Sequence, residues 1–345
     1  MPTLPASAEG APRRPMHAAA VLLAAVLWGT TGTVAHFAPA GSSALAIGLA
    51  TFGIGGLVLA AISFRRVVAV LRERAHLGWL LAGAVGVVLY PAAYYPSMTL
   101  AGVAVGNVVA LGSGPIFAAL LEWTVDRRRP DARWAIATGI AVVGIVLLAV
   151  GGHAGADGSS AGADASAATG VGLALLAGFG YALYAFAGAR LIGRGASASG
   201  AMGSLFLVGG LACLGWLAIV GLGPLLAPAG LLTIGYLALV PMALAYLLFG
   251  YALRALPSSS ATTLALAEPV VATLLAVLVV GERPTPLGWA GLVVVAIGIA
   301  LLAAPRRLGA GRLTLRGPRV GSGYSTAREG DPDHDRAGPP HEAPR

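Results

Sequence analysis

Residues 115–149 (PIFAALLEWTVDRRRPDARWAIATGIAVVGIVLLA) align without a gap with residues 269–303 (PVVATLLAVLVVGERPTPLGWAGLVVVAIGIALLA), 154 positions later. The second stretch repeats Pro115, Pro130 and Gly144 of the first in register. Alanine and leucine identities arise easily by chance in apolar sequence, but aligned prolines and glycines are much harder to obtain that way. The alignment therefore predicts a chain built from two related halves.

The composition excludes most soluble classes of protein. Of the 345 residues, 57% are hydrophobic and only 10% are charged, whereas soluble domains carry about 25% charged residues. Soluble enzymes, disordered proteins and coiled coils are therefore poor fits, and we predict a polytopic membrane protein. The chain contains arginine but no lysine, which excludes a Walker A loop and a Schiff-base lysine. In such a protein we interpret the basic residues as topology signals and predict no nucleic-acid partner.

Ten apolar runs are long enough to cross about 30 Å of hydrocarbon as helices. They lack the alternation of two residues that marks a barrel strand, so we predict an all-α integral membrane fold with ten transmembrane helices. The runs lie at 17–36, 44–64, 77–98, 101–122, 133–151, 170–191, 200–220, 230–251, 259–280 and 286–304.

Segments of different composition flank the runs and divide them into two groups of five. A stretch rich in Gly, Ala and Ser in the middle of the chain is typical of a flexible linker. The C-terminal segment, rich in Pro, Gly and Arg, has no periodic apolar face and predicts disorder. We expect a cytoplasmic N-terminal arm (1–15), a first five-helix repeat (16–151), an external linker (152–169), a second five-helix repeat (170–304) and a disordered cytoplasmic tail (305–345).

The arginines predict the orientation of these helices. If the chain starts in the cytoplasm and alternates sides, the outer loops contain Arg283 alone, whereas the inner loops contain Arg13, Arg14, Arg65, Arg66, Arg72, Arg74, Arg127, Arg128, Arg129, Arg133, Arg190, Arg194 and Arg254. This bias places both termini in the cytoplasm, and we predict an inner-membrane location. Five helices per half is an odd number, so the second half must enter the membrane inverted, as in many secondary transporters.

Three motifs resemble those of a known family. Trp28-Gly29-Thr30-Thr31-Gly32 in the first helix, Glu268-Pro269, and Val280-Gly281-Glu282-Arg283-Pro284 are similar to motifs of the EamA-type transporters of the drug/metabolite transporter superfamily. The likeness spans about 18–304, although the first half has Val125–Pro130 in place of the Gly-Glu form. The resemblance implies ten helices with both ends in the cytoplasm and, often, export of amino acids or other small metabolites. It also implies a central cavity lined by helices 1, 3, 4, 6, 8 and 9.

Glu268 is the sharpest candidate for a functional residue. It falls near the middle of the ninth run, where an ionised carboxylate costs roughly 2.5–3.5 kcal/mol on insertion scales. It could bind a cationic group or carry a coupling proton. Alternatively, it could satisfy backbone groups that Pro269 frees. Glu122, near the arginine-rich end of the fourth helix, is expected to be solvated or ion-paired.

Aromatic and amide side chains inside the runs are candidates for a substrate cage. Packing between helices is the alternative for each of them, and an interhelical hydrogen bond is the alternative for the amide. These candidates are Trp28, Tyr90, Tyr94, Asn107, Tyr181, Tyr184 and Tyr246. Three prolines inside runs could bend helices during gating or break backbone bonds without further effect, and these are Pro91, Pro241 and Pro269.

Other chemistry has little support in the sequence. The six histidines form no pair at metal-ligand spacing, so no metal or cofactor is predicted. No paired acids and no nucleophile with a base lie within the runs, so we predict no enzyme. The prediction is a secondary transporter that exports small metabolites such as amino acids by alternating access, with protons as an optional coupling partner and the lipid bilayer as its surroundings. A multidrug exporter and a passive channel of the same architecture are the alternatives, and the oligomeric state is left open.

Overall fold

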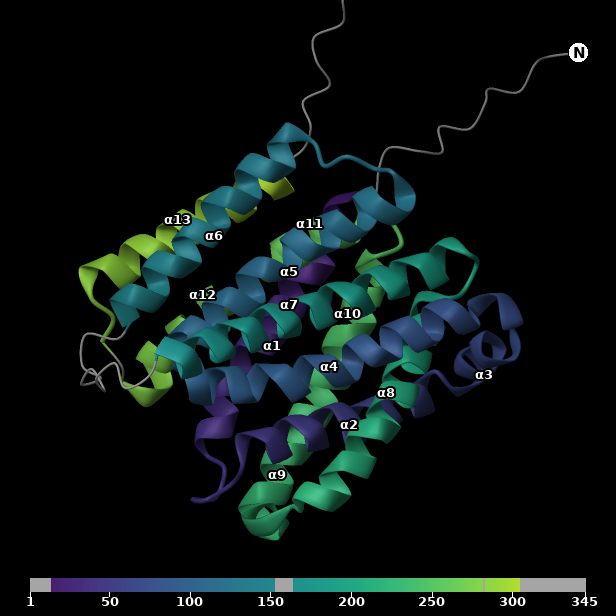
Figure 1. Cartoon of the computed structure of the whole chain (residues 1–345), viewed down its shortest axis with the longest axis horizontal. Coiled ribbons are helices and arrows are strands. Elements are labelled where there is room, and N and C mark those ends of the chain that lie inside the picture. Colours follow the sequence, from purple (N-terminus) through teal and green to yellow (C-terminus); the bar gives the residue numbers. More distant parts are fainter. Residues whose placement is uncertain (1–13, 153–163, 282, 305–345) are drawn as a thin grey trace, which may run out of the picture. The chain divides into compact units, whose positions relative to one another are not determined.

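The computed structural model describes residues 14–152, 164–281 and 283–304. Within these ranges the chain is all-helical, and ten helical spans are long and apolar enough to cross a membrane. This confirms the predicted fold class, an integral multi-pass membrane protein (Figure 1). The parts of the predicted arm, linker and tail at 1–13, 153–163 and 305–345 lie outside the described residues.

The first half supplies five unbroken spans, and two of the second half's spans are interrupted. The first five are α1 (Arg14–His36), α2 (Ala44–Ile62), α4 (Leu77–Ala101), α5 (Val103–Asp126) and α6 (Ala132–Gly152). The second half begins with α7 (Asp164–Gly193) and α8 (Ala198–Val220) and ends with α13 (Pro286–Ala303). Its eighth span consists of α9 (Pro228–Leu237), a π-helical segment (Ala238–Leu244) and α10 (Ala245–Ala252). The ninth consists of α11 (Ser258–Ala265), α12 (Glu268–Leu275) and a second π-helical segment (Ala276–Val280).

The repeat extends to the helix caps of the second span of each half. Ser43 precedes α2 and accepts a hydrogen bond from the backbone N–H of Ala46. Ser197, 154 residues later, precedes α8 and accepts one from Gly200. A serine in this position satisfies an N–H group that the helix itself leaves unpaired. The offset of the sequence alignment therefore holds outside the aligned window.

Two glycines at equivalent positions show the symmetry that relates the halves. A Cβ atom on Gly144 of α6 would lie 2.5 Å from the backbone nitrogen of Val295, and one on Gly298 of α13 would lie 2.8 Å from that of Ala141. Gly144 and Gly298 are 154 residues apart, and so are Ala141 and Val295. The contact of Gly144 with Val295 is therefore repeated, with the two halves exchanged, as the contact of Gly298 with Ala141. Such reciprocal contacts are the mark of a twofold relationship. Figure 1 shows the two helices side by side.

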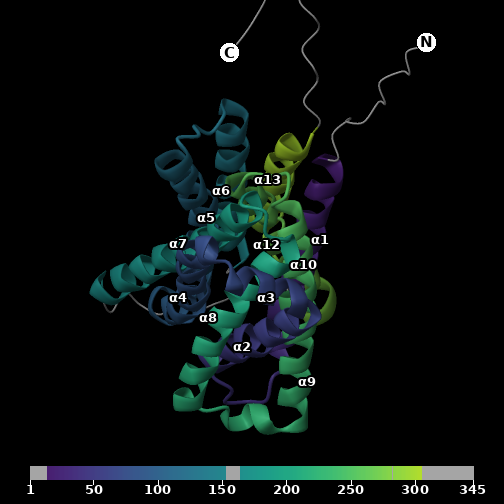
Figure 2. The ribbon, with the colours of Figure 1, turned by 90° about the vertical axis from the view of Figure 1, so that its right-hand side faces the viewer.

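The other helices pack across the halves in the same reciprocal way. In the first half, α1 packs on α10, α11 and α12 of the second. In the second half, α7 packs on α4 and α5 of the first, and α2 packs directly on α8. Figure 2 shows the first and second halves interleaved rather than standing apart as separate bundles. Any site at the centre of this arrangement is therefore built by both halves.

One short helix was absent from the sequence prediction. α3 (Phe64–Arg72) follows α2 directly, where we expected the end of an apolar run and an arginine-rich loop. It buries Val67 and Val70 against α8 and leaves Phe64 and Leu71 exposed. Nine residues are too few for a span, and the arginines between the apolar positions hide the helical period.

The sixth span is longer than predicted. α7 begins at Asp164, inside the segment 152–169 that we expected to be a linker. The sequence from Asp164 to Ala168 contains three alanines, the residue with the strongest intrinsic helix preference, and an acidic residue suits the first turn.

Candidate functional site

A cavity of about 370 Å³ lies where the two halves meet. This volume is within the range of about 300–1,000 Å³ that small-molecule sites usually have. Nearly all of the site residues predicted from the sequence line it, namely Trp28, Tyr90, Tyr94, Asn107, Tyr181, Tyr184, Pro241, Tyr246, Glu268 and Pro269. Pro91 does not line it, because it is buried within α4, which continues through it as far as Ala101.

The structure adds lining residues beyond the site residues selected from the sequence; of these, Tyr95 and the motif residues Gly29, Thr31 and Gly32 are already conspicuous in the sequence. α2 contributes to the wall, although the resemblance implied helices 1, 3, 4, 6, 8 and 9 only. An apolar ring in an apolar helix has no contrast with its surroundings, so no local signal distinguishes Phe52 from packing residues. The additional lining residues are Gly29, Thr31, Gly32, Ala35, Ala44, Ile47, Thr51, Phe52, Tyr95, Met98, Val103, Leu111, Met242 and Ala272.

Glu268 faces the cavity from a break in the ninth span. α11 ends at Ala265 and α12 begins at Glu268, with Pro269 in its first turn. Proline lacks the N–H that would continue the helix from α11, which explains the break. The Glu268 side chain makes no hydrogen bond or ion pair with another described residue. Its carboxylate therefore lies about midway through the span, partly exposed to the cavity and without a partner among the described residues.

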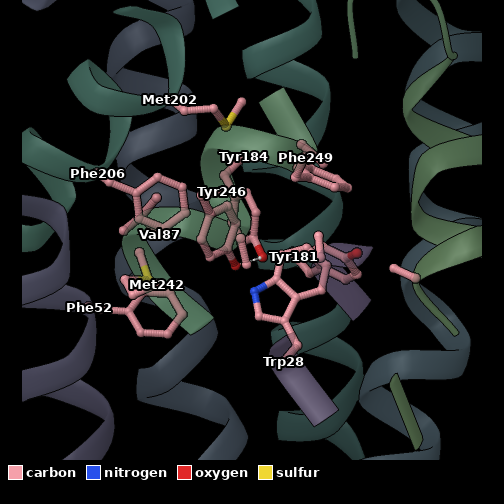
Figure 3. Close-up of a cluster of buried hydrophobic side chains, with 14 of the residues drawn as sticks. Trp28, Phe52, Val87, Tyr181, Tyr184, Met202, Phe206, Met242, Tyr246 and Phe249 are labelled. Atoms are coloured by element: carbon pink, nitrogen blue, oxygen red, sulfur yellow. Dashed lines mark hydrogen bonds between the residues drawn. The ribbon is translucent and has the colours of Figure 1, made fainter. Parts of the chain in front are cut away.

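Trp28, which lines the same cavity as Glu268, joins the two halves. Its indole N–H donates a hydrogen bond of 2.8 Å to the carbonyl oxygen of Pro241. Pro241 lies in the π-helical segment of the eighth span. The indole ring also packs on Tyr246 and Phe249, with centroid distances of 5.1 and 5.4 Å (Figure 3). The position of Trp28 is thus set by the second half of the chain.

A compact aromatic cluster lies next to Trp28. The hydroxyls of Tyr184 and Tyr246 share a hydrogen bond of 2.6 Å, and Phe206 packs on Tyr246 with a centroid distance of 4.2 Å. Figure 3 shows these rings packed against one another, with Tyr181 at their side. Tyr181 also lines the cavity, but its buried hydroxyl has no hydrogen-bond partner. A buried polar group without a partner is uncommon in native proteins.

The remaining wall is also aromatic. Tyr90 stacks on Tyr94 at 5.1 Å and lies against Phe52 at 5.8 Å. The hydroxyl of Tyr94 donates a hydrogen bond of 2.7 Å to the side-chain oxygen of Asn107, which leaves the amide NH₂ of Asn107 available. Rings, one amide and one carboxylate suit the binding of a small amphipathic molecule. Among the described residues, no group of three His, Cys, Asp or Glu side chains could hold a metal ion.

Comparisons with known proteins identify the family. Residues 16–150 and 168–304 each match the EamA-like transporter family. The chain belongs to this family. It is 35% identical over 290 residues to the uncharacterized transporter YwfM of Bacillus subtilis (strain 168), an alignment that covers 83% of this chain and 94% of that protein. The crystal structure of another protein has the same fold. The two structures superpose with a TM-score of 0.69 at 20% sequence identity, over 83% of this chain and 95% of the other chain.

In this EamA-family transporter the central cavity extends toward only one end of the bundle. Its outermost lining residues, Ala35, Ala44, Met98 and Val103, lie at helix termini of the arginine-poor end. At the opposite end is a second cavity of about 940 Å³, lined by several arginines and acids. The two cavities share no lining residue. The aromatic cluster therefore separates the central cavity from the arginine-rich end.

Glu122 lies at the wall of this second cavity, and our expectation for it was wrong. It is only 8% exposed, and it accepts hydrogen bonds from the hydroxyl of Ser258 (2.7 Å) and from the hydroxyl (2.7 Å) and backbone N–H (2.9 Å) of Ser259. The carboxylate thus caps the N-terminus of α11, a role usually taken by a side chain from the same helix. Its partners are 136 and 137 residues away, so no local pattern could predict the contact.

Two arginines of the same end also have structural partners. Arg190 of α7 pairs with Asp126 of α5. Arg133 of α6 donates a hydrogen bond of 2.9 Å to the carbonyl oxygen of Leu301 and another to that of Ala304. A cation that binds the last carbonyl groups of a helix stabilises its C-terminus. Arg133 therefore fastens α6 to α13 at the arginine-rich end.

Proposed function

We propose that this transporter exports small amphipathic metabolites, amino acids among them, by alternating access, and that Glu268 carries the coupling proton. The observation that supports this most is the carboxylate of Glu268, which has no partner among the described residues and lies in a cavity that both inverted halves build. An intramembrane acid facing a cavity is a default candidate for a substrate or proton pathway.

The asymmetry of the cavities supports alternating access. The positive-inside rule assigns the arginine-rich end to the cytoplasm, with both termini on that side of the inner membrane. The central cavity then extends toward the outside, and the aromatic cluster together with Glu122 closes the inside. Because the halves are related by a twofold axis, exchanging their conformations would open the opposite end around the same cavity. In that state the contacts of Glu122 with Ser258 and Ser259 would have to break.

Proton coupling follows from the chemistry of one carboxylate. A carboxyl group in a site of low dielectric is stable either protonated or paired with a positively charged group, and unstable as a bare anion. If substrate and proton use Glu268 in turn, proton entry can drive substrate exit. Replacing the carboxyl by an amide would remove this exchange and leave the shape of the cavity nearly unchanged.

The test is flux in proteoliposomes that contain purified full-length protein. A metabolite panel that includes amino acids is measured with and without an imposed pH gradient. We expect the wild type to show counterflow and a response to the gradient, and Glu268→Gln to lose the response. Glu73→Gln, which changes an exposed glutamate outside both cavities, is the matched control and should behave as wild type.

Other outcomes of the same experiment would refute the coupling role or favour one of the two alternative functions. A Glu268→Gln variant with full pH-dependent transport would refute the coupling role. Flux without stimulation by substrate on the opposite side would indicate a passive channel, because a channel has no exchange step. Uptake of many structurally unrelated drugs in place of metabolites would indicate a multidrug exporter.

A further inference from the structure

The charges in the central cavity narrow the class of substrate. Glu268 is the only formally charged side chain among the described residues that line it, and neither arginine nor histidine is present there. The chain as a whole contains no lysine. The described arginines that line a cavity belong to the second one, at the other end of the bundle. A bound anion would therefore face a carboxylate with no positive side chain to offset it.

The positive end of a helix does not supply the missing charge. Helix N-termini attract anions, and broken helices in transporters often use them in this way. Here the broken ninth span places Glu268 itself in the first turn of α12. The helix terminus is thus already next to a carboxylate of the protein.

Several polar groups of the cavity make no hydrogen bond with a described residue; the side-chain NH₂ of Asn107 is a donor of this kind, and two others are acceptors. The carboxylate of Glu268 has no hydrogen bond or ion pair with a described residue, and the hydroxyl of Tyr181, whose side chain is only 5% exposed, is an orphan. Both oxygens can accept a hydrogen bond. The hydroxyls of Tyr184 and Tyr246, in contrast, satisfy each other. A ligand that donates hydrogen bonds and carries positive charge would pair with these two acceptors.

Aromatic rings line the same cavity as these acceptors. Trp28, Tyr90 and Tyr94 line the same cavity together with Phe52. The faces of such rings attract cations, most strongly where water is excluded. They also bind the apolar body of a ligand. A carboxylate set among rings is the arrangement expected for a protonated amine on an aromatic or aliphatic group.

We infer that the substrate is a small organic cation, a protonated amine on an apolar body that lacks a carboxylate of its own. The inference rests on the proposed function and makes it more specific, because it ranks amines above zwitterionic amino acids. The ammonium group donates to Glu268 and to the hydroxyl of Tyr181, and the body lies against the rings. A substrate carboxylate is disfavoured, since like charges repel strongly in a site with little water.

The test uses three compounds with the same benzene ring. Phenylalanine carries an amine and a carboxylate. Phenethylamine has the amine but no carboxylate, and 3-phenylpropionate has the carboxylate but no amine. Binding to the purified full-length protein is measured by isothermal titration calorimetry. We expect phenethylamine to bind about tenfold or more tightly than phenylalanine, and 3-phenylpropionate to bind most weakly; a tenfold ratio is a modest value for one uncompensated charge.

Two variants test whether Glu268 and Tyr181 cause the preference for phenethylamine over phenylalanine. Glu268→Gln should weaken phenethylamine binding about tenfold or more and reduce the preference for it over phenylalanine. Tyr181→Phe keeps the ring and removes one acceptor, so we expect about two- to tenfold weaker binding of phenethylamine. Glu73→Gln is the matched control and should keep the affinity and the ranking of the wild type. Melting temperatures of all variants verify that each is folded.

The inference is overturned if phenylalanine binds as tightly as phenethylamine, if Glu268→Gln leaves the ranking unchanged, or if none of the three compounds binds. Counterflow measured with the same compounds separates this result from the proposed function. Counterflow of phenylalanine without phenethylamine would contradict the substrate class and retain the transporter. Tight phenethylamine binding without any counterflow would contradict the transport proposal and retain the ligand class.

Discussion

Ser259 donates both its backbone N–H and its hydroxyl to the carboxylate of Glu122, at 2.9 and 2.7 Å. The contact joins α5 of the first half to α11 of the second, next to the arginine-rich cavity. A buried carboxylate that accepts several hydrogen bonds is costly to replace, because its donors lose a charged acceptor. This contact links the two halves at the arginine-rich end.

Replacing Glu122 by alanine should loosen that end. Ser258 and Ser259 would lose their acceptor, and we expect the free energy of unfolding to fall by about 1–3 kcal/mol. Labelling of a cysteine at Ser260, which lines the second cavity, should become faster in a Cys213→Ser background. The control, Glu73→Gln, changes an exposed glutamate but keeps an oxygen acceptor for the backbone N–H of Ala75, and should shift stability by less than about 0.5 kcal/mol. If the melting temperature and the labelling rate of Glu122→Ala equal those of the wild type, the contact of Glu122 with Ser258 and Ser259 does not hold this end together.

The twofold relationship predicts matched effects at two distant glycines. Gly144→Ala and Gly298→Ala would each place a methyl group within 3 Å of backbone atoms of the facing helix. Over-packing of this kind costs about 1–3 kcal/mol, so both variants should melt at lower temperature. Gly139→Ala, on the same helix as Gly144 but with nothing within 4 Å, should be neutral or slightly stabilising. Differential scanning fluorimetry in detergent would measure all three, and a neutral Gly144→Ala would argue against the close crossing.

The hydrogen bond between Trp28 and Pro241 predicts a specific cost for losing the indole N–H. Trp28→Phe keeps a ring in the cavity wall but leaves the carbonyl oxygen of Pro241 without its donor. We expect a loss of about 0.5–1.5 kcal/mol in stability and a lower rate of counterflow. Trp123→Phe is the matched control, because Trp123 is 48% exposed and lies outside both cavities. If the two substitutions lower stability and counterflow equally, the hydrogen bond between Trp28 and Pro241 contributes nothing specific to either.

The inverted arrangement predicts that Arg72 and Arg283 lie on opposite sides of the membrane. Both side chains are exposed in the structure. In a Cys213→Ser background, a membrane-impermeant thiol reagent should label Arg283→Cys in intact cells, and label Arg72→Cys only after the membrane is opened. Labelling of both positions from the same side would refute the proposed topology.

Local sequence properties predicted much of the fold and of the site. Each span is apolar over its own length, so all ten could be located without knowledge of the others. Polar and aromatic residues in the middle of apolar runs are conspicuous, and for this reason Glu268, Trp28 and Asn107 were identified in advance. Phe52 was missed because a phenylalanine in an apolar helix is not conspicuous. α3 was missed because it is short and interrupted by arginines.

The sequence by itself determined the number of spans, the division into related halves and the predicted charge asymmetry. Membrane insertion depends on the transfer free energy and flanking charge of each segment separately, and both can be evaluated along the chain. Only the tertiary structure decided which acids have partners. Glu122 and Glu268 are both acids within apolar helices, yet one is held by two serines from the other half and the other faces a cavity alone. That difference depends on how distant helices pack together, and no segment carries this information on its own.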